Sequence, residues 1–488
     1  MMSLALRYSD FMETILRQHK SHNIEEARNW EQLPSELVVK IVQKLDLADS
    51  IRLSVVCKHW RLIVKENKQR NAQVPWLMLP RDRHDTSNCS NFLRFVDMSD
   101  GVFYNIKLPP NIVPGGGWCC CGSSKGWLAI ISMVEKGRPK SKSKSKFDPK
   151  LFLFNSISGI QVPLPSIATI PSFATFLDNL EFGYDHNNVT ELANFIKRVE
   201  LLPSSSSAVD VDARNCIVAA ATTTALYIDD ELELALCKPG DTKWTIFDKE
   251  TEEEDDDKFI SDILFYNGEL HVLVLCKHEV ISFEIHTKYI KVGDHDHQVI
   301  LRFIPNNWMS LLPTIDTIWV PEDESEHLAW ILPYLVESSQ GELLIVHKIM
   351  DTVFSDGEDE EAAEGEGVMI YEKLIRFEVF KIDPISSDTM GLTKLNSLDN
   401  QTLCVSKPST PLSVPVAPGD DDIGILKKNC IYFVDDSNYV PNPSRESGMF
   451  QLEDGRIQRF IPTRIPIHYP TNCMTWFSPN LKIASMRD

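Results

Sequence analysis

The chain has 488 residues, of which 43% are hydrophobic and 24% charged, and its formal net charge is −21 at pH 7. This length exceeds the usual size of one hydrophobic core, so two or more domains are expected, in a composition typical of soluble globular protein. The negative charge counts against nucleic acid as a partner, and no apolar run approaches the roughly 18 residues of a membrane span, so no membrane partner is expected.

Residues 1–28 are interpreted as a short helical lead-in without the long hydrophobic segment of a secretory signal. The next stretch has a helical pattern, because Leu37, Val38, Ile41, Val42 and Leu45 recur at helical spacing and predict one apolar face. Ser35 or a neighbour can cap this helix, and Glu36 in its first turn carries a charge that the helix dipole favours.

A second helical pattern covers residues 51–63 and carries apolar side chains around most of its circumference. About forty residues cannot bury this much apolar surface among themselves. A large exposed apolar patch usually marks an interaction site. The segment is therefore expected to dock on another protein or domain.

The segment from Trp30 to Arg61 resembles the F-box almost position for position, most specifically at Leu33-Pro34 and at residues 56–61. The resemblance implies that the ligase linker subunit Skp1 contacts seven side chains, namely Leu33, Pro34, Leu37, Ile41, Leu45, Leu53 and Val56. It also implies a small helical core filled by Trp30, Cys57 and Trp60. The alternative is an ordinary helical hairpin packed on the remainder of the chain.

From about Asn91 onward the pattern changes to short apolar, β-branched and aromatic runs separated by Gly, Pro, Asn and Asp, which is typical of antiparallel strands. The expected strands lie at 126–131, 151–155, 160–164, 215–218, 225–228, 232–236, 244–247, 263–266, 270–274, 334–336, 343–346, 377–380, 430–434, 449–452 and 457–460. Asn267-Gly268 between two such runs predicts a hairpin. The repeated strand–turn–strand unit suggests the blades of a β-propeller, while a β-sandwich or a pair of barrels stays open.

This C-terminal part resembles plant F-box families that carry the domain of unknown function 295, including the kelch-like kink-suppressed-in-bzr family. The matching strings include Gly126-Trp127-Leu128, Pro163-Leu164-Pro165 and residues 429–433. The resemblance implies an α+β protein in which a small helical F-box at 29–70 is followed by a large all-β, kelch-like propeller domain at 75–480. Charged loops are expected at 137–146, 252–257 and 356–367, because like charges repel and have nothing to bury.

Two short runs of cysteine, aspartate and histidine are the candidates for metal binding or catalysis in this sequence. Cys119, Cys120 and Cys121 are consecutive, so on a strand they alternate between faces and cannot converge on one metal ion. The sequence Asp294-His295-Asp296-His297 lacks further ligands at a fitting spacing. No nucleotide-binding loop and no nucleophile elbow is present, so neither a metal, nor a cofactor, nor enzymatic activity is expected.

The 11 cysteines show no regular spacing, which favours reduced thiols and a location in the nucleus and/or cytoplasm. Tryptophans are expected in the blade cores rather than at a binding face, at positions 118, 127, 244, 308, 330 and 476. Isolated histidines are expected in the core or at the surface, at positions 186, 271, 278, 327 and 347.

The resemblance implies a substrate-recognition adaptor of an SCF-type (Skp1-cullin-F-box) E3 ubiquitin ligase. Its partners would be a Skp1-like linker, through it a cullin, and an unidentified target protein held by the β domain. One alternative is a scaffold or inhibitor that acts outside a ubiquitin ligase. Another is a propeller hydrolase, which would need a convergent cluster of acid, base or metal ligands in the central channel.

Overall fold

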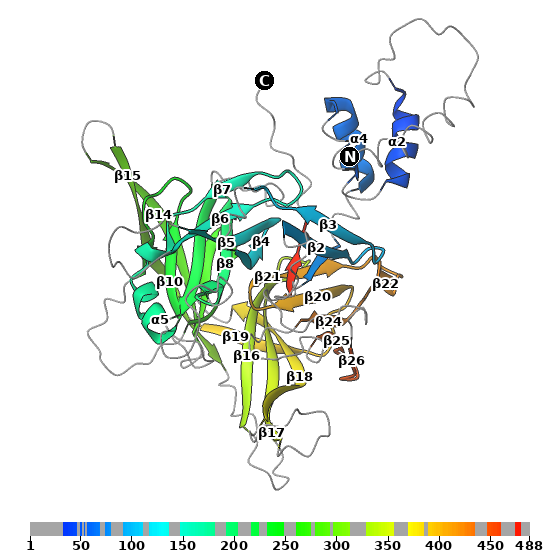
Figure 1. Cartoon of the computed structure of the whole chain (residues 1–488). Helices are drawn as coiled ribbons and strands as arrows, with labels where there is room; N and C mark the ends of the chain where they lie inside the picture. The colour runs from blue at the N-terminus through cyan, green and yellow to red at the C-terminus, as the bar shows by residue number, and fades with distance from the viewer. Residues whose placement is uncertain are drawn as a thin grey trace, which may run out of the picture. The chain divides into compact units, whose positions relative to one another are not determined.

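The structure is a computed structural model of the chain (Figure 1). It describes residues 33–45, 49–50, 53, 56–68, 74–79, 91–110, 117–135, 147–180, 192–203, 216–223, 232–247, 260–274, 279–292, 296–312, 328–355, 369–384, 389–434, 447–459 and 474–479. The predicted lead-in at 1–28, Trp30, the strand at 225–228 and the three charged loops lie outside these residues. The chain divides into two compact units, Met1–Gln69 and Arg70–Asp488.

The smaller unit contains α2 (Ser35–Lys44) and α4 (Lys58–Lys68). Pro34, rather than Ser35, occupies the N-cap of α2, and no side chain caps this end. The prediction of a Ser35 cap was therefore wrong. Ser35 is the first helical residue, and its hydroxyl lies 3.2 Å from Nε2 of His59, so it links α2 to α4 instead.

The second predicted helical pattern is interrupted at Val56-Cys57, and α4 begins only at Lys58. The backbone N–H of Trp60 reaches Cys57 Sγ at 3.5 Å, which satisfies one of the free donors at the start of α4. The core of this unit consists of Val38, Ile41, Val42, Leu53, Trp60, Ile63 and Val64. Six of these residues lie at helical spacing on α2 and α4, so the two helices turn their apolar faces toward each other, and Leu53 precedes α4.

The larger unit is a β-propeller whose first four blades follow one another along the chain (Figure 1). The first contains β4 (Trp118–Ser124), β5 (Trp127–Glu135), β6 (Phe147–Phe154) and β7 (Gln161–Pro163). The second contains β8 (Ile196–Pro203), β9 (Cys216–Thr223), β10 (Leu232–Cys237) and β11 (Thr245–Ile246). The third contains β12 (Ile260–Tyr266), β13 (Glu269–Val274), β14 (Glu279–Val292) and β15 (Asp296–Leu312), and the fourth β16 (Leu328–Glu337), β17 (Leu343–Ser355), β18 (Met369–Pro384) and β19 (Thr389–Leu395).

Two further sheets complete the ring of described strands. One contains β20 (Gln401–Ser406), β21 (Ser409–Pro415), β24 (Cys430–Phe433), β25 (Gly448–Gln451) and β26 (Ile457–Arg459). The other contains β27 (Thr475–Phe477), β1 (Trp76–Leu79), β2 (Phe92–Asp97) and β3 (Phe103–Lys107). Because β27 pairs antiparallel with β1, segments from both ends of the propeller close the ring, with Trp76 opposite Phe477.

Short segments outside the blades complete the described secondary structure. A 3₁₀ helix, η4 (Ile167–Thr169), and α5 (Ser172–Leu180) pack on the first and second blades, and β22 (Asp422–Ile423) pairs with β23 (Leu426–Lys427). Within the described residues, no helix is long and apolar enough to cross a membrane.

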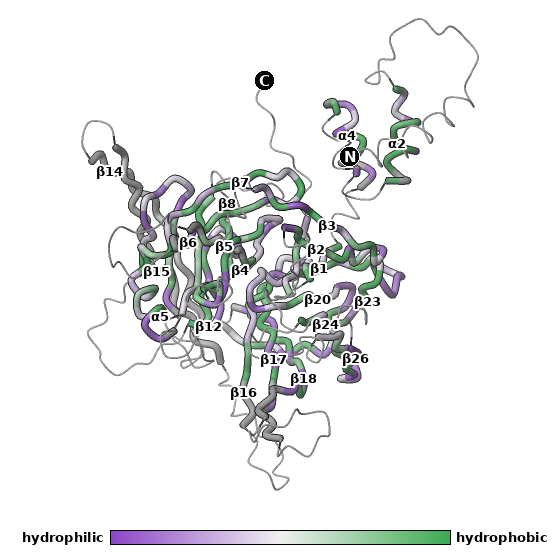
Figure 2. The backbone as a smooth tube through the Cα atoms, in the orientation of Figure 1, coloured by the Kyte–Doolittle hydropathy of each residue, from purple (hydrophilic) through white to green (hydrophobic). Residues whose placement is uncertain are grey.

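Successive blades pack face to face through apolar clusters. One cluster joins β4–β7 to β8–β10, the next joins β9–β10 to β12–β13, and another joins β16–β18 to β20, β24 and β25. Figure 2 shows hydrophobic residues concentrated along strands such as β5, β8 and β16. Burying these faces against neighbouring blades is the dominant stabilising contribution in a fold of this kind.

The predicted hairpin at Asn267-Gly268 is confirmed. Both residues have positive φ angles, 52° and 86°, and join β12 to β13 by the type of tight turn that matches strand twist. All other predicted strands that the structure describes, from β5 to β26, overlap observed ones, although β16, β17 and β18 extend well beyond the predicted bounds. The propeller interpretation is thereby favoured over a sandwich or a pair of barrels.

Candidate functional site

The surface of the F-box unit exposes apolar side chains to solvent. Val56 is 48% exposed, and Leu62 is 59% exposed on the side of α4 that faces away from Trp60, Ile63 and Val64. Pro34 is also exposed, and Leu37 is half-buried. We call this set, together with the half-buried Leu33 and Leu45, the F-box surface.

The seven side chains expected to contact the linker divide into two groups. Five belong to the F-box surface: Leu33, Pro34, Leu37, Leu45 and Val56. Ile41 and Leu53 are only 3% and 8% exposed, so in this form they support that surface from beneath. Trp60 lies in the core, and Cys57 packs partly buried against it.

Sequence reasoning did not single out Leu62. The signal was present, because Trp60, Ile63 and Val64 are spaced i, i+3 and i+4 and define the inner face of α4. Leu62 lies off that face, and a leucine on the outer face of an amphipathic helix is a candidate contact residue.

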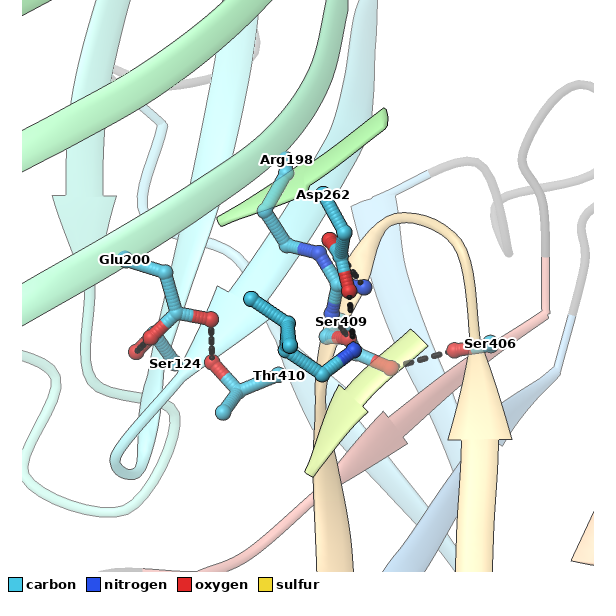
Figure 3. Close-up of polar contacts among 8 residues, drawn as sticks. Ser124, Arg198, Glu200, Asp262, Ser406, Ser409 and Thr410 are labelled. Carbon is cyan, nitrogen blue, oxygen red and sulfur yellow. Dashed lines mark hydrogen bonds and ion pairs between the residues drawn. The ribbon is translucent and has the colours of Figure 1, made fainter. Parts of the chain in front are cut away.

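A second candidate region is a cluster of charged and hydroxyl side chains where the inner strands of the propeller meet, which we call the axial cluster (Figure 3). Its members are Ser124 on β4, Arg198 and Glu200 on β8, Asp262 on β12, Ser406 on β20, and Ser409 and Thr410 on β21. The alternating geometry of a strand turns Arg198 and Glu200 to the same face of β8. Sequence reasoning missed this cluster.

Arg198 and Asp262 form a buried ion pair. Nη2 of Arg198 lies 2.8 Å from Oδ1 of Asp262, and both side chains are 3% exposed. Nη1 of Arg198 donates to the backbone carbonyl of Ser409, and Oδ2 of Asp262 accepts from the backbone N–H of Leu335 at 2.7 Å. Burial raises the pKa of Asp262, while the neighbouring guanidinium opposes that shift.

Glu200 is fully buried and accepts hydrogen bonds from two hydroxyls. Oε1 accepts from Thr410 Oγ1 at 2.6 Å, and Oε2 accepts from Ser124 Oγ at 3.4 Å. Burial raises the pKa of Glu200 to about 7, against the opposing effect of Arg198. The carboxyl group is therefore held near the midpoint of its titration at neutral pH.

The hairpin that joins β20 to β21 fills the space beside this cluster. The backbone N–H of Ser123 donates to the carbonyl of Pro408 at 3.2 Å, and a Cβ atom built on Gly122 would lie 2.4 Å from the same oxygen. Only glycine at position 122 permits this close approach. On β27, Nε1 of Trp476 donates to the carbonyl of Val405 at 3.1 Å.

The structure thus brings two carboxyl groups and one guanidinium together beside the β20–β21 hairpin, and all three are buried. The cluster's hydrogen bonds are made within the chain. Among the described residues, Nε of Arg198 is the one atom of the cluster that is buried without a partner. In this form the axial cluster joins β4, β8, β12 and β21.

The cysteine run and the Asp-His run are the remaining candidates for chemistry. Cys119, Cys120 and Cys121 are buried in β4. Burial raises the pKa of the Cys120 thiol to about 12 and also raises the pKa of the Cys121 thiol, so these two thiols stay protonated at neutral pH. The described part of the chain contains no group of three or more His, Cys, Asp or Glu that could hold a metal ion. The side chains of Asp294, His295, Asp296 and His297 lie outside the described set.

The tryptophans and histidines singled out from the propeller sequence are buried wherever the structure describes their side chains. Trp118, Trp127, Trp244 and Trp476 are at most 4% exposed, which confirms their expected place in the core, and His271 and His347 are also buried. The side chains of Trp308 and Trp330, and residues His186, His278 and His327, are not among those described.

Comparisons with known proteins agree with this architecture. Residues 95–451 match the model of the KIB1-4 beta-propeller family, and residues 30–70 match that of the F-box domain. The chain is 32% identical over 108 residues to an F-box/kelch-repeat protein of Arabidopsis thaliana, a match that covers 21% of this chain and 26% of that protein. The chain thus spans about a quarter of the length of this curated relative.

Among solved structures, the chain resembles putative 6-phosphogluconolactonases from Bacteroides uniformis and Bacteroides fragilis. Sequence identities are 10% and 11%, and the TM-scores are 0.27 and 0.28. Each match covers 83% of this chain and 99% or 98% of the other. At these scores, nothing about the chemistry of this chain follows from the resemblance.

Proposed function

This chain belongs to the KIB1-4 β-propeller family and carries an F-box, as plant F-box proteins with a propeller domain do, and we propose that it is the substrate-recognition adaptor of an SCF-type E3 ubiquitin ligase. The combination of F-box and propeller is typical of non-catalytic adaptors. The observation that carries the proposal is the F-box surface, which leaves Val56 and Leu62 in solvent.

In the proposed complex, a Skp1-type linker covers the F-box surface. Each leucine or valine side chain that becomes completely buried against the linker contributes about 1.5–3 kcal/mol to the free energy of binding. Pro34, Val56 and Leu62 are already exposed and need no rearrangement to contact a partner. Ile41 and Leu53 hold the two helices together beneath them, which keeps the contact residues in place before binding.

The linker would connect the chain through a cullin to a ubiquitin-conjugating enzyme, and the propeller would hold a target protein nearby. The contribution of this chain to the reaction would be proximity, because tethering raises the effective concentration of a target lysine beside the ubiquitin thioester. Residues that make or break covalent bonds would belong to other subunits.

The direct test is co-purification of the full chain with a recombinant Skp1-type linker. We expect the natural chain to retain the linker and a Leu33→Ala/Pro34→Ala double variant to lose it. An Ile457→Ala variant is the matched control, since Ile457 is an exposed apolar residue of the propeller and should leave binding unchanged. Failure of the folded natural chain to bind the linker would refute the proposal.

A further inference from the structure

Exposed apolar side chains gather at one place on the propeller. Among its described residues, the large hydrophobic side chains exposed by more than a third are Val102 (43%), Phe103 (52%), Ile425 (38%) and Ile457 (42%). Ile457 lies on β26, while the other three belong to the β2–β3 turn with the start of β3, and to the β22–β23 turn. Clustering of this kind marks an interaction site more strongly than single exposed residues do.

The two turns lie side by side (Figure 1). The backbone N–H of Ile425 donates to the carbonyl of Met98 at 2.9 Å. The backbone N–H of Asp97 donates to the carbonyl of Val102, also at 2.9 Å. Gly424 packs so closely that a Cβ atom there would lie 2.4 Å from the carbonyl oxygen of Met98. These contacts fix the β22–β23 turn against the β2–β3 turn.

Beside these turns runs the free edge of β3, the last strand in the order β27-β1-β2-β3. The bonds from Asp97 to Val102 and from Leu108 to Asn91 show that even-numbered residues of this segment turn their backbone groups toward β2. The backbone groups of Phe103, Asn105 and Lys107 consequently point away from the sheet. No described strand pairs with them.

The β3 edge is longer than three other strands at the outer end of a sheet. It has five residues, whereas β7, β11 and β26 have three, two and three. An unpaired edge of this length is a template for pairing with another extended chain, unless it is blunted by proline, bulges or covering segments. The described register between β2 and β3 contains no bulge.

Charge is distributed unevenly along this edge. Asp100, Asp420, Asp421 and Asp422 are exposed at the end next to Phe103, where Asp421 is paired with Lys428 at 2.7 Å and Lys427 is also exposed. Arg94 and Lys107 are exposed toward the other end. An incoming strand with a basic residue near Phe103 and an acidic residue near Lys107 would match both ends.

We propose that the β3 edge takes up an extended segment of the target protein as an added strand. The backbone of that segment would pair with Phe103, Asn105 and Lys107, and an apolar side chain would pack on Phe103 and Ile425. A basic residue would lie at the end near Asp100. The inference deepens the proposed adaptor role and rests on it, since it names the surface that holds the target.

The test uses an array of short synthetic peptides in which apolar residues alternate with polar ones, carrying arginine at one end and glutamate at the other, or the reverse. Binding to the full chain is followed by fluorescence anisotropy, and the contact by hydrogen exchange at the amides of Phe103, Asn105 and Lys107. We expect the two series to differ in affinity, because only one polarity places arginine near Asp100 and glutamate near Lys107, and we expect the tighter-binding series to protect these amides. Absence of binding, or protection elsewhere only, would overturn the proposal.

Two variants separate strand pairing from apolar contact. Asn105→Pro removes an outward N–H without removing a bond to β2, and should weaken binding roughly threefold to tenfold. Phe103→Asp removes the apolar contact and should weaken it roughly tenfold to a hundredfold. Ile457→Asp on β26 is the matched control and should have no effect. Equal binding by all variants would contradict the assignment to β3.

Linker co-purification is measured on the same samples, so the two proposals can fail separately. Retained linker and an unchanged urea unfolding midpoint, together with lost peptide binding in Phe103→Asp, show that both units are folded and assign the peptide site. Peptide binding by a natural chain that retains no linker would refute the adaptor role and leave the β3 edge as a binding site. Linker retention by a natural chain that binds no peptide would refute the β3 assignment alone.

Discussion

The F-box leaves apolar side chains in water, whereas the propeller axis takes charged side chains out of it. Val56 and Leu62 are 48% and 59% exposed, while Arg198 and Asp262 are each 3% exposed. Each arrangement is unfavourable unless a partner compensates for it. The axial charges have partners inside the propeller, whereas Val56 and Leu62 remain exposed among the residues that the structure describes.

This contrast separates structural from functional residues. The axial cluster links β4, β8, β12 and β21 through bonds that need no ligand. Charged groups that converge in a propeller centre would ordinarily suggest an active site. Here the carboxyl groups and the guanidinium are buried and connect the inner strands to one another.

The largest effect is expected from breaking the axial ion pair. Arg198→Met leaves Asp262 buried without its cation, which should lower the free energy of unfolding by about 3–5 kcal/mol in urea titration. The control is Arg456→Met, which removes an exposed ion pair in which Arg456 Nη2 lies 3.4 Å from Asp454 Oδ2. This control should change the free energy of unfolding by only about 0–1 kcal/mol. Similar small losses in both variants would contradict the assigned role of the axial pair.

The next effect concerns Glu200 and pH. Its folded pKa of about 7 lies above the unfolded value of 4.5, so the folded state binds the extra proton between these values. The contribution of Glu200 to the free energy of unfolding is fully present below about pH 4.5. It is lost as pH rises through 7, by roughly 3 kcal/mol in total. Stability of the natural chain relative to Glu200→Gln should therefore fall between pH 5 and pH 8, and a constant difference would contradict this.

A smaller effect is expected from Thr410→Val, which keeps the shape of the side chain and removes the hydroxyl that Glu200 accepts from. Leaving a buried carboxyl oxygen without its donor should cost about 2 kcal/mol of stability. Thr393→Val, at an exposed hydroxyl 3.3 Å from Asp383, is the control and should change stability by less than about 0.5 kcal/mol. Equal losses would show that burial of the axial cluster has no energetic consequence.

The smallest effect is expected at the F-box surface. Leu62→Ala should leave the free energy of unfolding within about 0.5 kcal/mol of the natural value, because the side chain is already in solvent. It should nevertheless weaken binding of the Skp1-type linker roughly fivefold, about 1 kcal/mol. A large loss of stability would show that Leu62 belongs to the core of the chain.

Much of this architecture could be predicted from the sequence. The apolar spacing in α2 and the strand–turn–strand units encode local structure directly. The interruption of the helical pattern at Val56-Cys57 could not be predicted, because apolar residues continue through it. The inner strand β8 was missed because Arg198 and Glu200 make its pattern resemble a solvated loop. Their partners follow from the register of distant strands, with Thr410 lying 210 positions from Glu200.

The most direct test of the account compares two exposed apolar residues, Val56 of the F-box and Ile457 of the propeller, which are 48% and 42% exposed. The dissociation constant of a Skp1-type linker would be measured for the natural chain, Val56→Asp and Ile457→Asp. If the F-box surface binds the linker, Val56→Asp should weaken binding at least roughly tenfold and Ile457→Asp should leave the constant unchanged. Equal constants for all three chains, or no binding by the natural one, would contradict it.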